Sequence, residues 1–350
     1  MRVFLLLWIL FAGTTMAQSK YDYYMTTGIS LDNKGKSQLA VLFFDSAIAI
    51  NQNSEQPWFS RGIAKVHTKN FSEAVVDFNK AIYLRPNLEE AYLYRHIAYR
   101  QTENFQFAFG DINTFITLRP NDTVGRNYRF DLSLLLEEWD QAFEDLKWLS
   151  RLGDATYANR YLKFSSAMEQ AKAYESLGKF VEKLMSENPV NRNFRITLIY
   201  TQMQIGKWEQ ALGNVNIMLL DDPQNLELLK IKADALFYLK RISESEKIFL
   251  TILERNPTDA NLMADYGHCL LQLSKWESAD EWLTKAIRDK NGAPAYAYLG
   301  RGIARYNLGK VGVACADWER SLYLGEKNAK IYLNNFCKET AAENASNSIK

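Results

Sequence analysis

The sequence contains three histidines and three cysteines, residue types that commonly bind metal ions or act as a base and a nucleophile. The histidines, His67, His96 and His268, are scattered along the chain without the spacing that gathers ligands around a metal. His268 precedes Cys269, but adjacent residues on a helix point in different directions, so the two do not form a catalytic pair. The sequence also contains no glycine-rich phosphate loop, nucleophile elbow or paired-cysteine zinc spacing. We therefore predict a protein that is not an enzyme and that uses neither a metal ion nor a cofactor.

The charge balance and the composition narrow the class of protein further. The chain has 42 basic and 41 acidic residues and no basic cluster, so we expect no nucleic-acid partner. Hydrophobic residues make up 47% of the chain, which is enough for an ordered core. Only 17 glycines and 7 prolines are present, which favours helices over a sheet with many tight turns.

The first residues have the pattern of a secretory signal. A short basic start, Met1-Arg2, precedes an apolar run over residues 3–12 and the small residue Ala17. The apolar run is too short to cross a bilayer, which requires about 20 residues. We predict a signal peptide at 1–17 and an exported protein of the periplasm or cell envelope, with an uncleaved membrane anchor as the alternative. No later segment has the length and apolarity of a membrane span, so we expect none after signal cleavage.

Small residues recur at a nearly fixed period along the chain. They are followed four positions later by a large apolar residue, as in Phe44 after Ala40 and Phe78 after Ala74. The evenly spaced small residues are Ala40, Ala74, Ala108 and Ala142, and then Ala211, Ser245, Ala279 and Ala314. A small residue lets two helices approach closely, and the larger residue one turn on fills the groove between them. Because one helix pair cannot bury its own apolar face, the pattern predicts a stack of helix pairs.

The second of these units carries a recognisable set of residues. They are Trp58, Gly62, Ala74, Phe78, Ala81 and Pro86. This set closely resembles the tetratricopeptide repeat, although His96 and Phe130 replace the close-packing glycine in the next two units. The resemblance extends over about nine units, from near Tyr21 to near Ala329. It implies an all-α, right-handed solenoid of helix-turn-helix repeats with a C-terminal capping helix.

The repeat frame divides the chain into five segments. They are the signal peptide at 1–17, an N-terminal array of four repeats at 18–154, an irregular repeat or seam at 155–191, a C-terminal array of four repeats plus the capping helix at 192–338, and a flexible polar tail at 339–350. In the irregular repeat the turn signal Gly178-Lys179-Phe180 comes later than the repeat frame places it. We therefore predict a long first helix over Tyr157–Leu177 and a short second helix stopped by Pro189.

In four units an arginine is followed 16 residues later by an aspartate, and the other regular units have neither residue at these two positions. The pairs are Arg61 with Asp77, Arg95 with Asp111, Arg129 with Asp145 and Arg301 with Asp317. An unpaired buried charge is costly, so this coupling predicts a salt bridge between the two helices of one repeat. A ladder of arginines that binds a ligand is the alternative.

Two cysteines lie where the last repeat meets the capping helix. Antiparallel packing brings Cys315 and Cys337 to matching heights, and in an exported protein we expect a disulfide there. Two buried thiols are the alternative. Cys269 is expected to be a buried small hydrophobe.

The family resemblance also implies where a partner binds. In tetratricopeptide proteins the first helix of each repeat lines a concave groove that holds a peptide or a helix. The residues of this sequence that match the groove positions are Phe59, Ile63, Val66, Leu93, Ile97, Arg100, Tyr200, Phe237 and Tyr306, with Lys230 and Asp234 beside Phe237. Packing between neighbouring first helices is the alternative role for each residue. We predict a non-catalytic protein-interaction scaffold, with a helical glycan- or nutrient-binding accessory protein of the outer membrane as the alternative.

Overall fold

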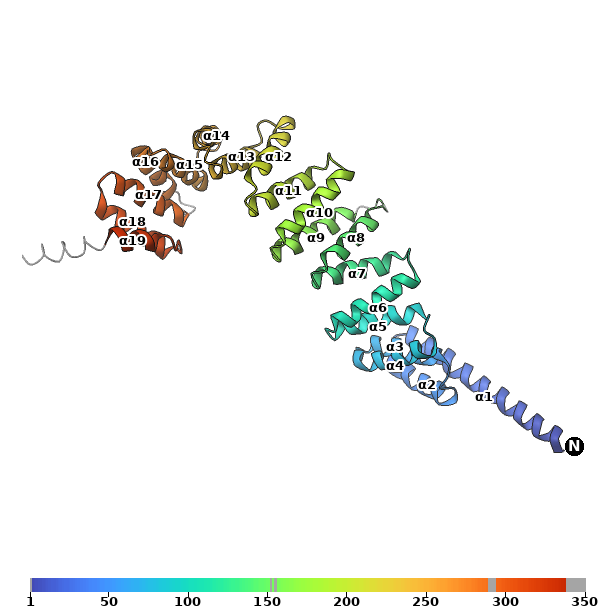
Figure 1. Cartoon of the computed structure of the whole chain (residues 1–350). Helices are drawn as coiled ribbons and strands as arrows, with labels where there is room; N and C mark the ends of the chain where they lie inside the picture. The colour runs from blue at the N-terminus through green and yellow to red at the C-terminus, as the bar shows by residue number, and fades with distance from the viewer. Residues whose placement is uncertain (1, 152, 154–155, 289–293, 338–350) are drawn as a thin grey trace, which may run out of the picture. The chain divides into compact units, whose positions relative to one another are not determined.

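The chain folds entirely into short helices. The computed structural model describes the backbone of residues 2–151, 153, 156–288 and 294–337, and the side chains of these residues from Gln18 onward. Within these ranges there are nineteen α-helices and no strand (Figure 1). The predicted tail at 339–350 lies outside the described residues. The helices form two compact units, an amino-terminal unit (Met1–Lys172) and a carboxy-terminal unit (Ala173–Lys350).

The amino-terminal unit contains the first nine helices. Their bounds are α1 Arg2–Asn33, α2 Ser37–Ile50, α3 Glu55–His67, α4 Phe71–Leu84, α5 Glu89–Gln101, α6 Phe105–Leu118, α7 Thr123–Leu135, α8 Trp139–Ser150 and α9 Tyr157–Gln170. Helix α1 includes the segment predicted as a signal peptide, and from Tyr21 onward its apolar side chains pack against α2. Odd-numbered helices are the first helices of the repeats and even-numbered helices are the second.

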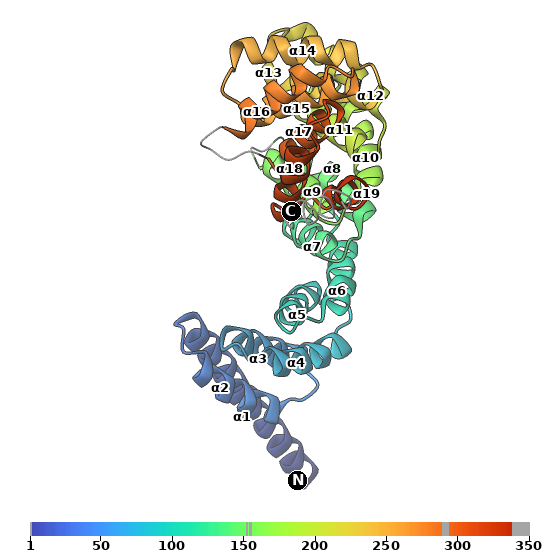
Figure 2. The same ribbon diagram turned by 90° about the vertical axis from the view of Figure 1, so that its left-hand side faces the viewer.

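The carboxy-terminal unit contains the other ten helices (Figure 2). Their bounds are α10 Tyr174–Glu187, α11 Arg192–Gln204, α12 Trp208–Asp221, α13 Leu226–Tyr238, α14 Ile242–Arg255, α15 Ala260–Gln272, α16 Trp276–Ile287, α17 Ala295–Asn307, α18 Val311–Tyr323 and α19 Ala329–Phe336. Among the described residues, helix α19 has no partner helix of its own; it packs against α18, as expected of a cap. The predicted all-α repeat solenoid is thereby confirmed.

One residue with a positive φ angle lies between the first and second helices of every repeat. In the described chain these residues are Gly35, Lys69, Glu103, Glu137, Lys172, Gly206, Lys240, Ser274 and Gly309. Each of these residues follows the previous one by 34 or 35 positions, which is also the spacing of the small residues within each array. In the second repeat the Lys69 N–H donates to Val66 O at 3.0 Å and the Asn70 N–H donates to Lys65 O at 2.8 Å. This pair of bonds is a Schellman motif, which satisfies the last carbonyls of a helix and reverses the chain.

The turn at Lys172 shows that the predicted long first helix and short second helix of the fifth repeat were wrong. Helices α9 and α10 have 14 residues each, and α10 runs through the 178–180 segment that we took for a turn. Two residues of the fifth repeat differ from the pattern of the other repeats. The true turn uses lysine rather than glycine, and the place of the small residue five positions later is taken by the fully buried Leu177. The point of division between the two units lies within the predicted 155–191 segment.

The helices of a pair fit together by complementary size. A Cβ atom added to Gly62 would lie 2.6 Å from Cε1 of Phe78, and one added to Gly302 would lie 2.3 Å from Nε1 of Trp318. In the third repeat His96 takes the place of this glycine, and the smaller Ile112 takes the place of Phe78. This exchange explains how the repeats tolerate His96, whose Nδ1 lies 2.9 Å from the Ala108 carbonyl.

The predicted arginine–aspartate pairs are confirmed in all four units. Arg95 shows the arrangement: its Nε donates to Asp111 Oδ2 at 2.8 Å and its Nη2 donates to Oδ1 at 2.5 Å. Its Nη1 donates to Asn79 of the preceding second helix at 2.5 Å. Arg61, Arg129 and Arg301 make the same two kinds of contact. The arginines therefore join neighbouring repeats, which favours the structural role over the ligand ladder.

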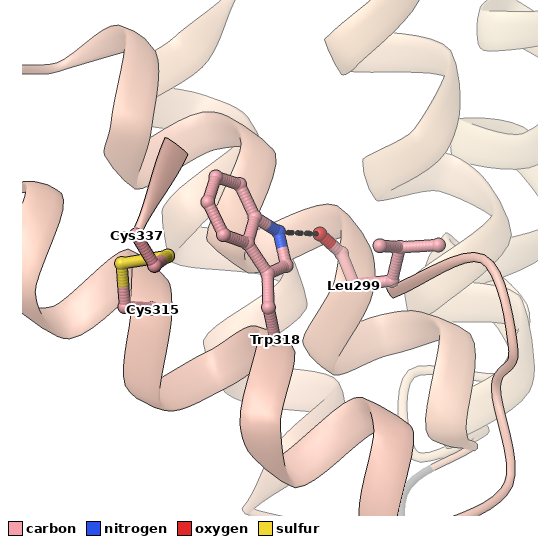
Figure 3. The surroundings of a disulfide bond; sticks show 4 residues. All are labelled: Leu299, Cys315, Trp318 and Cys337. Carbon is pink, nitrogen blue, oxygen red and sulfur yellow. Dashed lines mark hydrogen bonds between the residues drawn. A yellow bond between two sulfur atoms is a disulfide. The ribbon is translucent and has the colours of Figure 1, made fainter. Parts of the chain in front are cut away.

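A disulfide ties the capping helix to the last repeat. Cys315 of α18 and Cys337, directly after α19, are bonded with their Cα atoms 5.9 Å apart (Figure 3). Next to it the Trp318 Nε1 donates to the Leu299 carbonyl at 3.2 Å, which links α18 to α17. Cys269 is fully buried and forms no disulfide, and burial raises the pKa of its thiol to about 11.

In the part of the chain that is described, no helix combines the length and apolarity that crossing a bilayer requires.

The size fit predicts opposite effects for one substitution at two helical glycines. Gly62→Ala forces a methyl group against the buried Phe78 ring, so we expect a loss of about 1–3 kcal/mol of stability. Gly110→Ala, in α6, adds a methyl group to open space and removes the flexibility of glycine, so we expect a gain of about 0.5–1 kcal/mol. Thermal unfolding followed by circular dichroism measures both. Equal stability of the two variants would contradict the packing described.

Candidate partner-binding site

The groove residues predicted on α3 lie in the packing between repeats. Phe59, Ile63 and Val66 are half-buried against Phe78 and its neighbours. The Phe59 ring centroid lies 6.1 Å from that of Phe78 and 5.8 Å from that of Tyr94 on α5. These side chains hold neighbouring first helices together, which is the alternative role stated for them above.

The predicted residues on α5 are also partly covered. Leu93 packs against Ile112, and Ile97 is half-buried. The Arg100 guanidinium lies 6.0 Å from the ring centroid of Tyr128 on α7. The amino-terminal unit therefore uses its predicted groove residues mainly to join consecutive first helices.

The predicted residues of the carboxy-terminal unit have three different environments. Tyr200 is 41% exposed and its hydroxyl donates to Glu227 Oε1 at 3.3 Å. Tyr306 packs its ring 4.7 Å, between centroids, from Phe336 of the capping helix. Phe237 lines a cavity of about 560 Å³, and this cavity is the strongest candidate for a binding site.

Residues of three successive first helices form this cavity, which we call the first-helix pocket. It is lined by Lys230, Asp234, Phe237 and Tyr238 of α13, by Asp259, Asn261, Asp265 and His268 at the start and along α15, by Tyr296 of α17, and by Phe249 of α14. Gly300 lets α17 approach α15, because a Cβ atom there would lie 3.0 Å from Nε2 of His268.

The sequence placed Lys230, Asp234 and Phe237 in the groove but gave no reason to choose Asp265 or Tyr296. Asp234, Asp265 and Tyr296 follow one another at equal intervals, each of one repeat minus about one helical turn. Because each residue is offset by about one helical turn from the equivalent position in the previous repeat, its side chain lies diagonally across from the previous one on the neighbouring first helix. This interval is the sequence signal for the pocket, and it differs from the period at which the small residues recur.

The pocket holds more negative than positive charge. Its carboxylates are Asp234, Asp259 and Asp265, and its one ammonium group is Lys230. The Lys230 Nζ lies 3.5 Å from Asp265 Oδ2 and 3.7 Å from Asp234 Oδ2. The Tyr296 hydroxyl donates to Asp265 Oδ1 at 2.9 Å, and Asp259 accepts from the Leu262 N–H to cap α15. Asp234 is thus the carboxylate whose negative charge is least balanced by nearby cations and hydrogen-bond donors.

Burial shifts the ionisable groups in this pocket. It raises the pKa of Asp234 to about 6, and the charge of Asp265 adds to the shift while Lys230 opposes it. Burial together with the Asp265 charge raises the pKa of Tyr296, so its hydroxyl stays protonated and donates. Burial lowers the pKa of His268, whose Nε2 lies 3.2 Å from the Tyr296 carbonyl and donates to it as a neutral imidazole. The wall formed by His268 and Tyr296 is therefore neutral, and the carboxylates carry the charge.

The arrangement suits binding better than chemistry. Cys269, beside His268 in the sequence, is buried as a thiol and does not line the pocket. Among the residues that the structure describes, no cluster of three or more histidine, cysteine, aspartate or glutamate side chains could hold a metal ion.

A family model identifies the repeat. The model of the tetratricopeptide repeat matches residues 56–88, which cover the pair α3 and α4 and its closing proline. The other pairs have the same positive-φ turn at the same period. The chain is a tetratricopeptide-repeat protein. No curated protein matches it.

The chain is similar to several solved structures, each with less than 25% identity and a TM-score below 0.5. The chain resembles the structure of Naa15/Naa10 bound to HypK-THB with 13% identity and a TM-score of 0.49, covering 92% of this chain and 61% of that one. It resembles a tetratricopeptide-repeat protein from Parabacteroides merdae with 14% identity and a TM-score of 0.35, covering 82% and 99%. It resembles the first repeat domain of Spaghetti (RPAP3) bound to an HSP90 peptide with 22% identity and a TM-score of 0.34, covering 34% and 94%.

The raised pKa of Asp234 predicts a pH-dependent cost to stability. The folded tetratricopeptide protein holds the Asp234 proton up to about pH 6 and the unfolded chain only to about pH 4, so ionisation between these values destabilises the fold. We expect Asp234→Asn to be more stable than wild type by about 2 kcal/mol at pH 7.5, with the difference shrinking to near zero below pH 4. Urea unfolding across this pH range measures it.

Asp221→Asn is the control, because it removes the same charge from an exposed carboxylate outside the pocket. It should change stability by less than about 0.5 kcal/mol at every pH. If Asp234→Asn shows no gain at pH 7.5, Lys230 already compensates the Asp234 charge.

Proposed function

We propose that this protein is a non-catalytic scaffold that binds a segment of a partner protein on the first helices of its carboxy-terminal unit. The observation that carries the proposal is the first-helix pocket, a cavity of about 560 Å³ with aromatic and charged walls. Cavities of this size with a few convergent polar groups are typical binding sites. Tyr238 at this pocket is 57% exposed and Tyr200 is 41% exposed, so aromatic surface is available for contact.

The rigidity of the pocket walls supports binding without large rearrangement. The Tyr238 ring stacks on Trp208 with centroids 4.1 Å apart, and the Tyr296 hydroxyl is fixed by Asp265. Walls fixed by contacts within the protein lose little conformational entropy when a ligand binds. A partner segment would therefore meet a preformed surface.

The cell envelope is the compartment we propose. The basic start and short apolar run at 1–17 have the form of an export signal. The disulfide between Cys315 and Cys337 is of the kind that persists in oxidising compartments, which supports export. The buried Cys269 is shielded from the same oxidants.

A glycan- or nutrient-binding role is the second candidate. Phe237, Tyr238 and Tyr296 give the pocket aromatic faces, and Asn261 and the aspartates give it hydrogen-bonding groups. A neutral sugar can use such a lining, but it does not compensate the excess of carboxylates. We therefore rank a protein partner first.

In-cell photocrosslinking tests the scaffold function. A photoreactive phenylalanine analogue in place of Tyr238 lies at the pocket, and the same analogue in place of Tyr323 lies on second helix α18, where the native side chain is 79% exposed. We expect one or a few proteins to crosslink at position 238 and not at 323. Identical crosslinked species at both positions, or none at 238, would contradict a partner in the pocket and direct attention to glycans.

A further inference from the structure

We propose that the first-helix pocket binds an arginine side chain of the partner, an assignment that rests on the scaffold function proposed above. The guest guanidinium lies between the carboxylates of α13 and α15 and against the aromatic rings around them.

Charge favours a cationic guest. Three aspartates and one lysine line the pocket, so its carboxylates exceed its cations by two. Lys230 stands 3.5 Å or more from Asp234 and Asp265, beyond the usual hydrogen-bond distance of about 3 Å. Lys230 pairs with both carboxylates only at these long distances, so a guest cation can add shorter charge-assisted hydrogen bonds to them, whereas a carboxylate or phosphate guest is repelled.

The shape of the pocket favours arginine over lysine. A guanidinium is planar and carries five N–H donors, so it can bond to two carboxylates while its face stacks on an aromatic ring. Asp234 and Asp265 supply the acceptors, and Phe237, Tyr238 and Tyr296 supply the rings. The protein uses the same combination elsewhere: Arg95 bonds to Asp111 and lies 5.5 Å from the ring centroid of Tyr92. The cavity volume also leaves room for residues next to the arginine.

The protonation of Asp234 should couple binding to pH. The ionisable groups that line the pocket with Asp234 are Lys230 and Tyr238 on its own helix, Asp259 at the N-cap of α15, Asp265 and His268 on α15, and Tyr296 on α17. With these neighbours its pKa is about 6, so the proton and a guest cation compete for the same carboxylate. Arginine binding should therefore weaken as the pH falls from 7.5 to 5.

A pair of isosteric ligands tests the assignment on the full-length protein. Nα-acetyl-arginine amide and its neutral isostere Nα-acetyl-citrulline amide are titrated while the amide chemical shifts of pocket residues are followed. We expect arginine to bind about tenfold or more tightly than citrulline, because only arginine makes charge-assisted bonds. We expect its affinity to fall several-fold at pH 5.

Matched variants locate the effect. Asp234→Asn/Asp265→Asn keeps the shapes and the acceptor for Tyr296, and should bind arginine no better than citrulline at either pH. Asp221→Asn/Glu254→Gln removes two exposed charges outside the pocket and should keep the wild-type preference. Equal binding of arginine and citrulline by the wild-type protein, or unchanged arginine preference in the pocket variant, overturns the assignment. So does maltotriose binding in the pocket without arginine binding.

The two proposals fail separately. A protein crosslinked at position 238, together with equal binding of arginine and citrulline, overturns the arginine assignment and keeps the scaffold function. Arginine preference without any crosslinked protein overturns the scaffold function and keeps the cation preference of the pocket.

Discussion

The structure depends on one residue with a positive φ angle between the two helices of each repeat. This residue lets the first helix end with satisfied carbonyls and sends the chain back at once, so the second helix can pack against the first. Glycine adopts this angle at little cost, yet six of the nine turns in the described chain use lysine, glutamate or serine. The packing of each pair must therefore compensate for strain at those turns. The size fit between residues such as Gly62 and Phe78, and the arginine bridges between neighbouring second helices, supply that compensation.

The same regular turn accounts for the candidate site. Because the repeats follow one another at a nearly constant period, residues separated by one period minus about one helical turn lie diagonally opposite on successive first helices. Asp234, Asp265 and Tyr296 line one pocket in this way, and Gly300 allows α17 to lie close to His268 of α15. Three repeats contribute residues to the pocket, and none of the three has a recognisable binding motif by itself. Its chemistry comes from placing two carboxylates together with a single lysine at the pocket wall.

The sequence predicted features that repeat and missed features that arise between repeats. The alanine and phenylalanine spacing identified the helix pairs, and the joint occurrence of arginine and aspartate identified the bridges before any distance was known. The helix bounds of the fifth repeat differ from the prediction because Lys172 and Leu177 stand where glycine and alanine occur in other repeats, and a turn tolerates lysine when packing fixes it. On α3 and α5, sequence alone could not separate groove residues such as Phe59 from the packing between first helices. That distinction depends on how closely neighbouring helices approach.

The stability effect of a lysine-to-glycine exchange tests the turn constraint most directly. Lys240 has a φ of 63° between α13 and α14, and Lys247 is an exposed residue within α14. Native-state hydrogen exchange measures the opening free energy of these two helices in each variant. We predict that Lys240→Gly stabilises the pair by about 1 kcal/mol, because glycine relieves the left-handed strain. We predict that Lys247→Gly destabilises it by about 1 kcal/mol. A loss of stability in Lys240→Gly as large as that in Lys247→Gly would contradict the claim that this position sets the repeat.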